Sequence, residues 1–106
     1  MAPIDFNGLD SAVHGPLRLG VLSALLIDGA LDFTTLRNRL KATNGALGMH
    51  LRKLEETGYV VCQKTFLGRR PRSTYRITSA GERALAGYVE AMQQIIDAIE
   101  TARRTP

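Results

Sequence analysis

Apolar residues recur three and four positions apart between Pro16 and Gly29, which is the spacing of one face of a helix. Proline suits the first helical position because its missing N–H costs nothing there, and glycine is common just after the last turn. Before this segment, Asp10 is expected to cap a short helix that the Gly15-Pro16 pair interrupts. The pattern predicts helical structure in two pieces over residues 9–27.

Two further segments carry the same period. Thr34 is expected to cap a second helix after a short extended link at residues 31–33. After a short turn, Thr43 is expected to cap a third helix over residues 44–57, which Gly58 ends. The predicted core-facing positions are Leu36 and Leu40 in the second helix, and Leu47, Leu51 and Leu54 in the third.

The period changes after the third helix. Residues 59–66 are rich in β-branched and aromatic side chains, which predicts a strand, and residues 74–78 predict a strand that returns beside it. Residues 67–73 (LGRRPRS) form a basic turn that contains Gly and Pro. The segment is therefore expected to be a β-hairpin with a long, charged tip.

The last apolar residues again follow a helical period, over residues 79–103. Thr78 or Ser79 is expected to cap this helix, and Glu82 lies where a capping-box carboxylate belongs relative to Ser79. Its apolar residues alternate three and four apart, as in a heptad seam, which predicts packing against a second copy of the chain. The expected dimer-interface residues are Leu85, Tyr88, Met92, Ile95 and Ile99, with Val89 and Ile96 beside them.

The order of elements is three helices, a hairpin and a long helix. The second and third helices, joined by a short turn, form a helix-turn-helix, and a hairpin placed directly after them is a wing. We expect an α+β fold that is mostly helical: a winged helix-turn-helix with a β-hairpin wing and a long C-terminal dimerisation helix. A length of 106 residues fits a single domain, with a core over about residues 9–78 and the dimerisation helix over 79–103.

Positive charge is concentrated in the middle of the chain. Residues 37–76 contain ten of the 14 Lys and Arg residues but only two of the 10 acidic ones. A solubilising surface usually mixes both signs, whereas a surface of one sign is typical of a protein that binds a polyanion. The middle of the chain is therefore expected to bind nucleic acid.

The predicted third helix is amphipathic, and a helix of this kind fits the major groove of DNA. Within it, Asn44 suits an adenine edge, and Arg52 or Lys53 suits a guanine or a phosphate. Arginines in the hairpin turn suit phosphates or a narrow minor groove. The predicted DNA-binding residues are Asn44, Gly45, Gly48, Met49, His50, Arg52 and Lys53 on the helix, and Arg69, Arg70 and Arg72 in the turn.

Three stretches resemble a known family. Residues 36–59 (LRNRLKATNGALGMHLRKLEETGY) resemble the helix-turn-helix of prokaryotic winged-helix regulators of the MarR and ArsR type, above all in the run HLRKLEETGYV at residues 50–60. Residues 64–85 (KTFLGRRPRSTYRITSAGERAL) look like the wing of small stand-alone regulators, and residues 14–25 (HGPLRLGVLSAL) look like their first helix. The resemblance covers about residues 9–100 and implies a homodimeric repressor or activator that binds double-stranded DNA.

The chain departs from that family at the exposed start of the recognition helix. Such regulators commonly have Ser or Thr there, whereas this chain has Gly45 and Gly48. Each glycine costs a helix roughly 1 kcal/mol relative to alanine, but it permits a close approach of the backbone to DNA.

Other classes of site find no support in the sequence. No Gly-x-Ser-x-Gly motif, P-loop or dinucleotide fingerprint occurs, which argues against an enzyme. His14 and His50 are far apart and have no ligand-spaced cysteine or carboxylate, so neither a metal site nor a cofactor is predicted. The lone Cys62 is expected to be a small buried hydrophobic residue. The N-terminus shows no signal-peptide pattern, and no apolar stretch approaches the roughly 20 residues of a membrane span, so a cytoplasmic protein is expected.

One alternative of another class remains open at this point. A winged helix whose basic face docks an acidic protein would show the same charge pattern, and it would bind duplex DNA only in the non-specific range. The sequence reveals no small-molecule effector.

Overall fold

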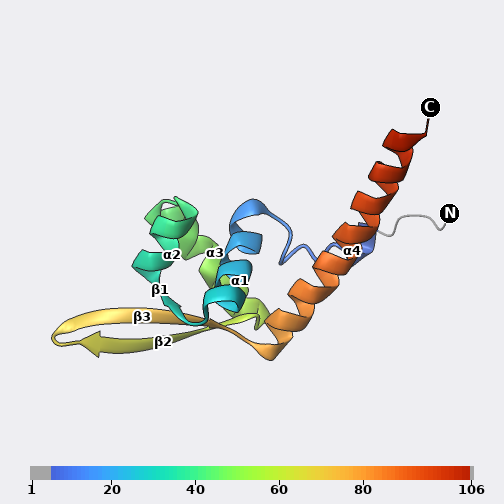
Figure 1. Ribbon diagram of the computed structural model, residues 1–106. Helices are drawn as coiled ribbons and strands as arrows, with labels where there is room; N and C mark the ends of the chain where they lie inside the picture. Colours follow the sequence, from blue (N-terminus) through green and yellow to red (C-terminus); the bar gives the residue numbers. More distant parts are fainter. Residues whose placement is uncertain (1–5, 106) are drawn as a thin grey trace.

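The computed structural model describes residues 6–105 of the chain. Figure 1 shows three helices packed together, a long hairpin extending to one side of them and a long helix extending to the other. This arrangement confirms the predicted mostly helical α+β fold, a winged helix with a hairpin wing and a long C-terminal helix. In chain order the elements are η1 (Phe6–Gly8), α1 (Pro16–Asp28), β1 (Leu31–Asp32), α2 (Phe33–Leu40), α3 (Asn44–Thr57), β2 (Val60–Leu67), β3 (Arg70–Ile77) and α4 (Ser79–Arg104).

The hydrophobic core lies where α1, α2 and α3 meet, and the base of the hairpin and the first turns of α4 close it. The predicted inner face of α3 is confirmed, because its three leucines are buried. On α1, by contrast, Leu26, one of the apolar residues between Pro16 and Gly29, is half exposed. The buried residues are Val13, Val21, Leu22, Ala24, Leu25, Leu36, Leu47, Leu51, Leu54, Val60, Tyr75, Leu85 and Tyr88.

The short helix expected after Asp10 is wrong, because this segment is a turn. The Asp10 carboxylate accepts a hydrogen bond from the Ala12 N–H at 2.8 Å, and the Asp10 carbonyl accepts from the N–H of Val13 and of His14. Only four residues separate Asp10 from Gly15-Pro16, where α1 begins as predicted, so no helix fits between them.

The cap of α2 also differs from the prediction. Asp32, not Thr34, accepts a hydrogen bond from the Thr35 N–H, at 2.7 Å, so the helix begins at Phe33. Asp32 has the extended backbone that a cap needs because it lies in β1, the strand that replaces the expected link. The caps of α3, Thr43 and Gly58, are those predicted.

The three strands form one antiparallel sheet in the order β1-β3-β2. β2 and β3 pair over eight positions, from Val60 opposite Ile77 to Leu67 opposite Arg70. The long loop predicted at residues 67–73 is therefore wrong, because only Gly68 and Arg69 lie between the strands. Gly68 has a φ of 66°, which lets so short a turn close.

Proline within β3 is tolerated for a reason that the sequence alone did not reveal. β1 pairs with β3 only at Thr74 and Tyr75, so at Pro71 the strand has β2 as its single neighbour. The missing N–H of Pro71 therefore interrupts no ladder on the other side.

The last helix, α4, is capped by Thr78 rather than Ser79, since the Thr78 hydroxyl accepts from the Gly81 N–H at 3.0 Å. The Thr78 hydroxyl also donates to the Gly58 carbonyl, which ties this cap to the end of α3. Over its 26 residues α4 is about 39 Å long. Only its first turns contact the core, so the molecule extends over 63 × 24 × 22 Å.

Candidate nucleic-acid interface

The outward side of α3 is open to solvent along its length. Gly45, Met49, Arg52 and Lys53 are exposed there, on the opposite side of the helix from its buried leucines. A Cβ atom added at Gly45 or at Gly48 would meet nothing within 4 Å. Packing within the chain therefore does not require these two glycines, and the helix backbone is accessible at its start.

Two side chains of the predicted set already have partners within the chain. The side-chain oxygen Oδ1 of Asn44 accepts a hydrogen bond from Arg37 Nη1 of α2 at 2.9 Å. His50 Nδ1 accepts from Arg18 Nε of α1 at 3.0 Å, and the same guanidinium donates to the Ser11 carbonyl. Arg37 and Arg18 thus hold the two flanks of α3, and neither belonged to the predicted site.

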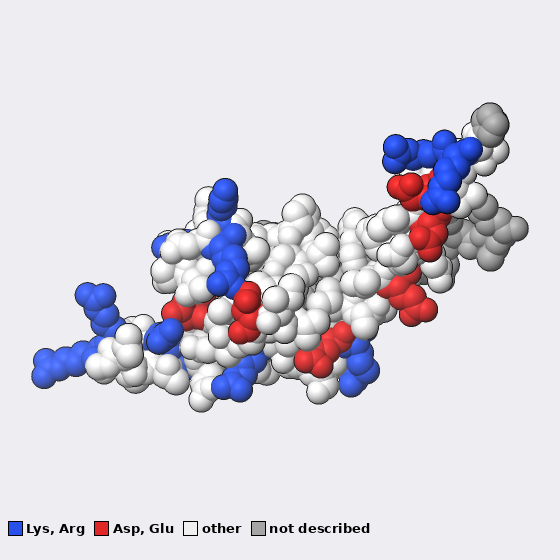
Figure 2. Space-filling model, in the orientation of Figure 1, with Lys and Arg blue, Asp and Glu red and all other residues white. Residues whose placement is uncertain are grey.

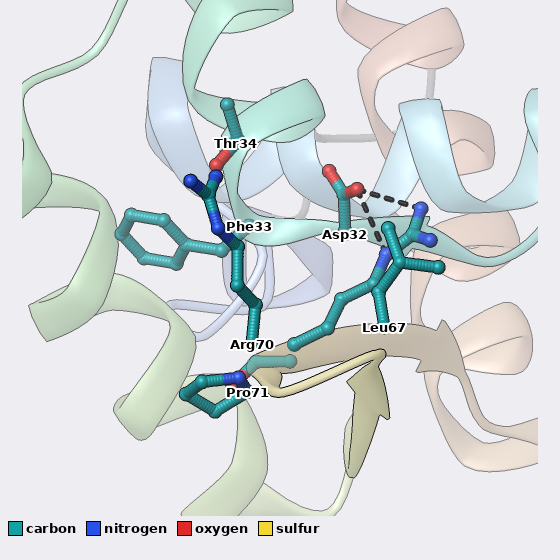
Figure 3. Close-up of a pocket in the computed structure, with 8 residues that line it drawn as sticks. Asp32, Phe33, Thr34, Leu67, Arg70 and Pro71 are labelled. Atoms are coloured by element: carbon teal, nitrogen blue, oxygen red, sulfur yellow. Dashed lines mark hydrogen bonds and ion pairs between the residues drawn. The ribbon is translucent and has the colours of Figure 1, made fainter.

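The three arginines of the hairpin divide into two kinds. Arg69 and Arg70 are exposed and form no ion pair within residues 6–105. Arg72 instead donates to the Asp32 carboxylate from Nη2 at 2.8 Å and from Nε at 3.1 Å. Both residues line a cavity of about 400 Å³ between the hairpin and the start of α2, where Figure 3 labels Asp32. Arg72 therefore links the wing to the helix-turn-helix.

The Asp32 carboxylate has two functions in this arrangement. One oxygen caps α2 and the other accepts from Arg72. The hydrogen bonds from Thr35 foremost, and then the guanidinium of Arg72, hold the pKa of Asp32 below its ordinary value. Asp32 therefore stays ionised under ordinary conditions and keeps the wing in place.

Charge is unevenly distributed over the visible face of the molecule. In Figure 2, blue side chains lie at the end of the hairpin and over the helix-turn-helix, with some red among them at the base of the hairpin, whereas most red side chains follow α4. Blue side chains also lie near the beginning of α4 and at its far end, where Arg103 and Arg104 end the helix. The hairpin is the part of the molecule with the most one-sided charge, because residues 57–81 contain no acidic residue.

The predicted dimer-interface residues on α4 lie in two different environments. Leu85 and Tyr88 are buried in the core of the chain itself. Met92 and Ile95 are partly buried, whereas Ile99 is 51% exposed. Beside this seam, Val89 and Ile96 are also exposed, so the second half of α4 carries an uncovered apolar side.

Sequence reasoning missed several residues of this region. Arg37 lies in the basic segment, but only the fold shows that it reaches Asn44. Phe66, a predicted strand residue, is 74% exposed near the end of the wing. The sequence indicated this residue only by placing apolar side chains next to the run of arginines. The pattern of a strand does not show whether such an apolar residue is buried or exposed.

The described residues also bear on the other kinds of site that the sequence raised. They contain no group of three or more His, Cys, Asp and Glu side chains placed to hold a metal ion. No helix among them is long and apolar enough to cross a membrane. Cys62 is partly buried against the core rather than fully buried as expected.

Comparison with known proteins gives the family. The model of the winged helix DNA-binding domain matches residues 17–96. The chain is 32% identical over 84 residues to the uncharacterised protein MJ0432 of Methanocaldococcus jannaschii, which covers 79% of this chain and 91% of that protein.

Solved structures agree with this match. A transcriptional regulator homologue from Pyrococcus horikoshii superposes with a TM-score of 0.80 and 29% identity, over 88% of this chain and 93% of that one. The regulator NadR, in complex with 4-hydroxyphenylacetate, superposes with a TM-score of 0.69 and 28% identity, over 91% of this chain and 67% of that one. Structural neighbours are transcriptional regulators of the MarR and PadR types, not enzymes. The match over most of its length shows that this chain belongs to the winged helix DNA-binding domain family.

Proposed function

We propose that the chain is a homodimeric transcriptional regulator that binds a specific sequence of double-stranded DNA. α3 enters the major groove, and the wing lies on the backbone or in the minor groove. The observation that carries this proposal is the joint exposure of two basic elements: the outward side of α3 with Arg52 and Lys53, and the wing end with Arg69 and Arg70.

The residues of α3 have separate roles in this proposal. Arg52 and Lys53 bind base edges or phosphates, and the accessible backbone at Gly45 and Gly48 lets the helix lie close to the groove. Asn44 reads a base with the orientation that Arg37 gives it, and His50 contacts a phosphate from the edge of the helix. Met49, exposed between them, provides an apolar contact.

The wing residues also differ in role. Arg69 and Arg70 bind phosphates or the minor groove, because each is exposed and has no acidic partner among the described residues. Arg72 contributes through its contact with Asp32, which sets the position of the hairpin relative to α3.

Dimerisation through α4 completes the proposal. Leu85 and Tyr88, the first two residues of the predicted seam, are buried in the chain's own core. A second copy would therefore contact the later residues of the seam, which are Met92, Ile95 and Ile99, with Val89 and Ile96 beside them. A two-fold dimer would present its two recognition helices about 34–36 Å apart, to successive major grooves of a pseudo-palindrome.

Titration against duplex DNA tests this function. The wild-type protein is titrated at several salt concentrations with the duplex from upstream of its own coding sequence and with a scrambled duplex of equal length. A preference of about 10³-fold or more, with a steep salt dependence, is expected of a specific regulator. Equal binding of both duplexes in the range of about 10⁻⁴–10⁻⁶ M would instead contradict specific binding and favour the basic face as a docking surface for an acidic protein.

A further inference from the structure

The free end of the hairpin exposes large apolar side chains among cations. Every residue from 63 to 72 is exposed, and Phe66 and Leu67 keep 74% and 66% of their surface open to solvent. Hairpin ends in water ordinarily carry polar turn residues, and exposed neighbouring apolar residues indicate a contact surface.

The register of the hairpin separates these two side chains. Phe66 lies opposite Pro71, whereas Leu67 lies opposite Arg70, and adjacent pairs in a ladder point to opposite faces. Leu67 lines the cavity beside the start of α2 (Figure 3), so it faces part of the chain. Phe66 does not line this cavity and points to the other face, which we call the apolar wing face. Its cross-strand partner Pro71 lies between the Phe66 ring and the cavity, which Pro71 also lines.

The charges around the apolar wing face indicate its partner. Lys64 shares this face by register, Arg69 lies in the turn beside it, Arg70 lies next to it on the other face, and no acidic residue lies between residues 57 and 81. A matching surface has an anionic rim and an apolar wall. The minor groove of DNA has both, because phosphates border it and the faces of deoxyribose rings form its sides.

The dimensions of the hairpin agree with this match. Phe66 precedes the Gly68-Arg69 turn by two positions, which places it roughly 7 Å from the tip at the rise of an extended strand. The minor groove is about 7.5 Å deep. A wing whose arginines reach into the groove therefore brings the Phe66 ring to the level of the sugars.

We propose that Phe66, with Pro71 behind it, packs against the deoxyribose rings of the minor groove and contributes affinity that salt does not screen. This inference rests on the proposed function, because it assigns a second kind of contact to the same wing. Lysine and arginine contacts release counterions and therefore weaken as salt rises, whereas burial of an aromatic ring releases none.

Salt dependence separates these two kinds of contact. Phe66→Ala is expected to bind the specific duplex about 10-fold more weakly at every salt concentration, with an unchanged slope of log K against log salt. Phe66→Leu keeps most of the affinity because it stays apolar. Arg70→Ala is expected to reduce the slope by about 1. Val61→Ala is the matched control, since Val61 is half exposed on the same strand but far from the tip, and its affinity should not change.

A fluorescence measurement tests burial directly. The chain contains no tryptophan, so Phe66→Trp and Val61→Trp each introduce a single reporter. On addition of the specific duplex, the reporter at position 66 should become protected from a soluble quencher, and the one at position 61 should not. Both positions are exposed, so neither variant should fail to fold.

Three outcomes overturn the inference. Unchanged affinity in Phe66→Ala, with wild-type preference for the upstream duplex intact, refutes the sugar contact and leaves the proposed function standing. A flattened salt slope in Phe66→Ala shows that the ring only orients the arginines. Absence of any duplex preference in the wild-type protein removes the proposed function and this contact together.

Discussion

The two halves of α4 have the same apolar period but opposite surroundings. From Ser79 to Tyr88 the apolar side lies against α1 and the base of the hairpin, and Leu85 and Tyr88 are buried. From Val89 onward the same side is largely uncovered: Met92 still packs against the core and Ile95 is partly buried, but Val89, Ile96 and Ile99 are exposed. The hairpin repeats this division, because Val60 and Tyr75 lie in the core whereas Phe66, near its tip, is exposed.

This division shows what an apolar pattern does and does not specify. A recurring apolar side predicts that a surface will be covered, but it does not say whether the cover is the same chain, a second copy or DNA. The chain covers its apolar residues near the centre and leaves them uncovered at both extensions. Substitutions at the centre should therefore change folding, and substitutions at the extensions should change association.

The largest effect is expected at Gly81, where α4 meets the rest of the chain. A Cβ atom there would lie 2.3 Å from the Tyr59 carbonyl oxygen and 2.8 Å from Ile77 Cγ1. Because the backbone at Tyr59 also accepts from the Thr78 N–H, it cannot move without loss of that bond. Gly81→Ala is expected to lower the free energy of unfolding by about 3 kcal/mol or more, measured by urea denaturation.

Gly87 provides the matched control on the same helix. A Cβ atom at Gly87 would meet nothing within 4 Å, so Gly87→Ala should raise stability by up to about 1 kcal/mol through helix propensity. An equal change in the free energy of unfolding of both variants would show that α4 does not pack against the Tyr59 backbone in solution.

The second effect concerns the uncovered half of α4. Ile99→Glu places a charge in the proposed seam and is expected to weaken the dimer by about 100-fold or more, roughly 2.7 kcal/mol, in sedimentation at several concentrations. Stability of the monomer should change little because Ile99 is half exposed in the single chain. Gln94→Glu adds the same charge at an exposed position on the opposite side of α4 and should leave the dimer intact. A mass unaltered by Ile99→Glu would remove this seam from the proposal.

The third effect separates folding from DNA binding on α3. Gly45→Ala combined with Gly48→Ala fills open space, so the helix should gain up to about 1 kcal/mol per site. If the two glycines let the backbone approach DNA, the same change should weaken duplex binding by about 10-fold, which is 1.4 kcal/mol. Gly87→Ala again serves as the control, since it is expected to stabilise the chain without loss of affinity. A stabilised α3 that binds DNA as well as wild type would mean that the glycines have no part in recognition.

Local signals in the sequence were sufficient for most of the fold. Pro16, Thr43 and Gly58 mark helix ends as predicted, because each acts through its own backbone or its nearest neighbours. Errors arose where a distant segment decided the structure. Asp32 caps α2 because pairing with β3 holds it extended, and residues 70–73 form a strand because β2 lies beside them.

The same distinction applies to the candidate site. The basic character of residues 37–76 and the exposed side of α3 follow from composition and period. The contacts of Arg72 with Asp32 and of Arg18 with His50 join residues 40 and 32 positions apart, so no local pattern contains them. The sequence therefore indicated where the basic surface lies, but it did not show which cations there form contacts within the chain.

The smallest effect is expected at the Asp32–Arg72 pair, where the wing joins the helix-turn-helix. Asp32→Asn keeps a side-chain oxygen that caps α2 and removes the ion pair, so the loss at neutral pH should stay below about 1 kcal/mol for a pair this exposed. The pKa of Asp32 is lowered in the folded chain, so its ionised form favours folding. This contribution is complete above the ordinary carboxyl pKa of about 3.9 and is lost as the pH falls through the lower, folded value. Urea denaturation from pH 6 to pH 2 should therefore show the gap between wild type and Asp32→Asn closing below about pH 4. A gap that persists at pH 2 would show that the carboxylate's charge does not stabilise this junction.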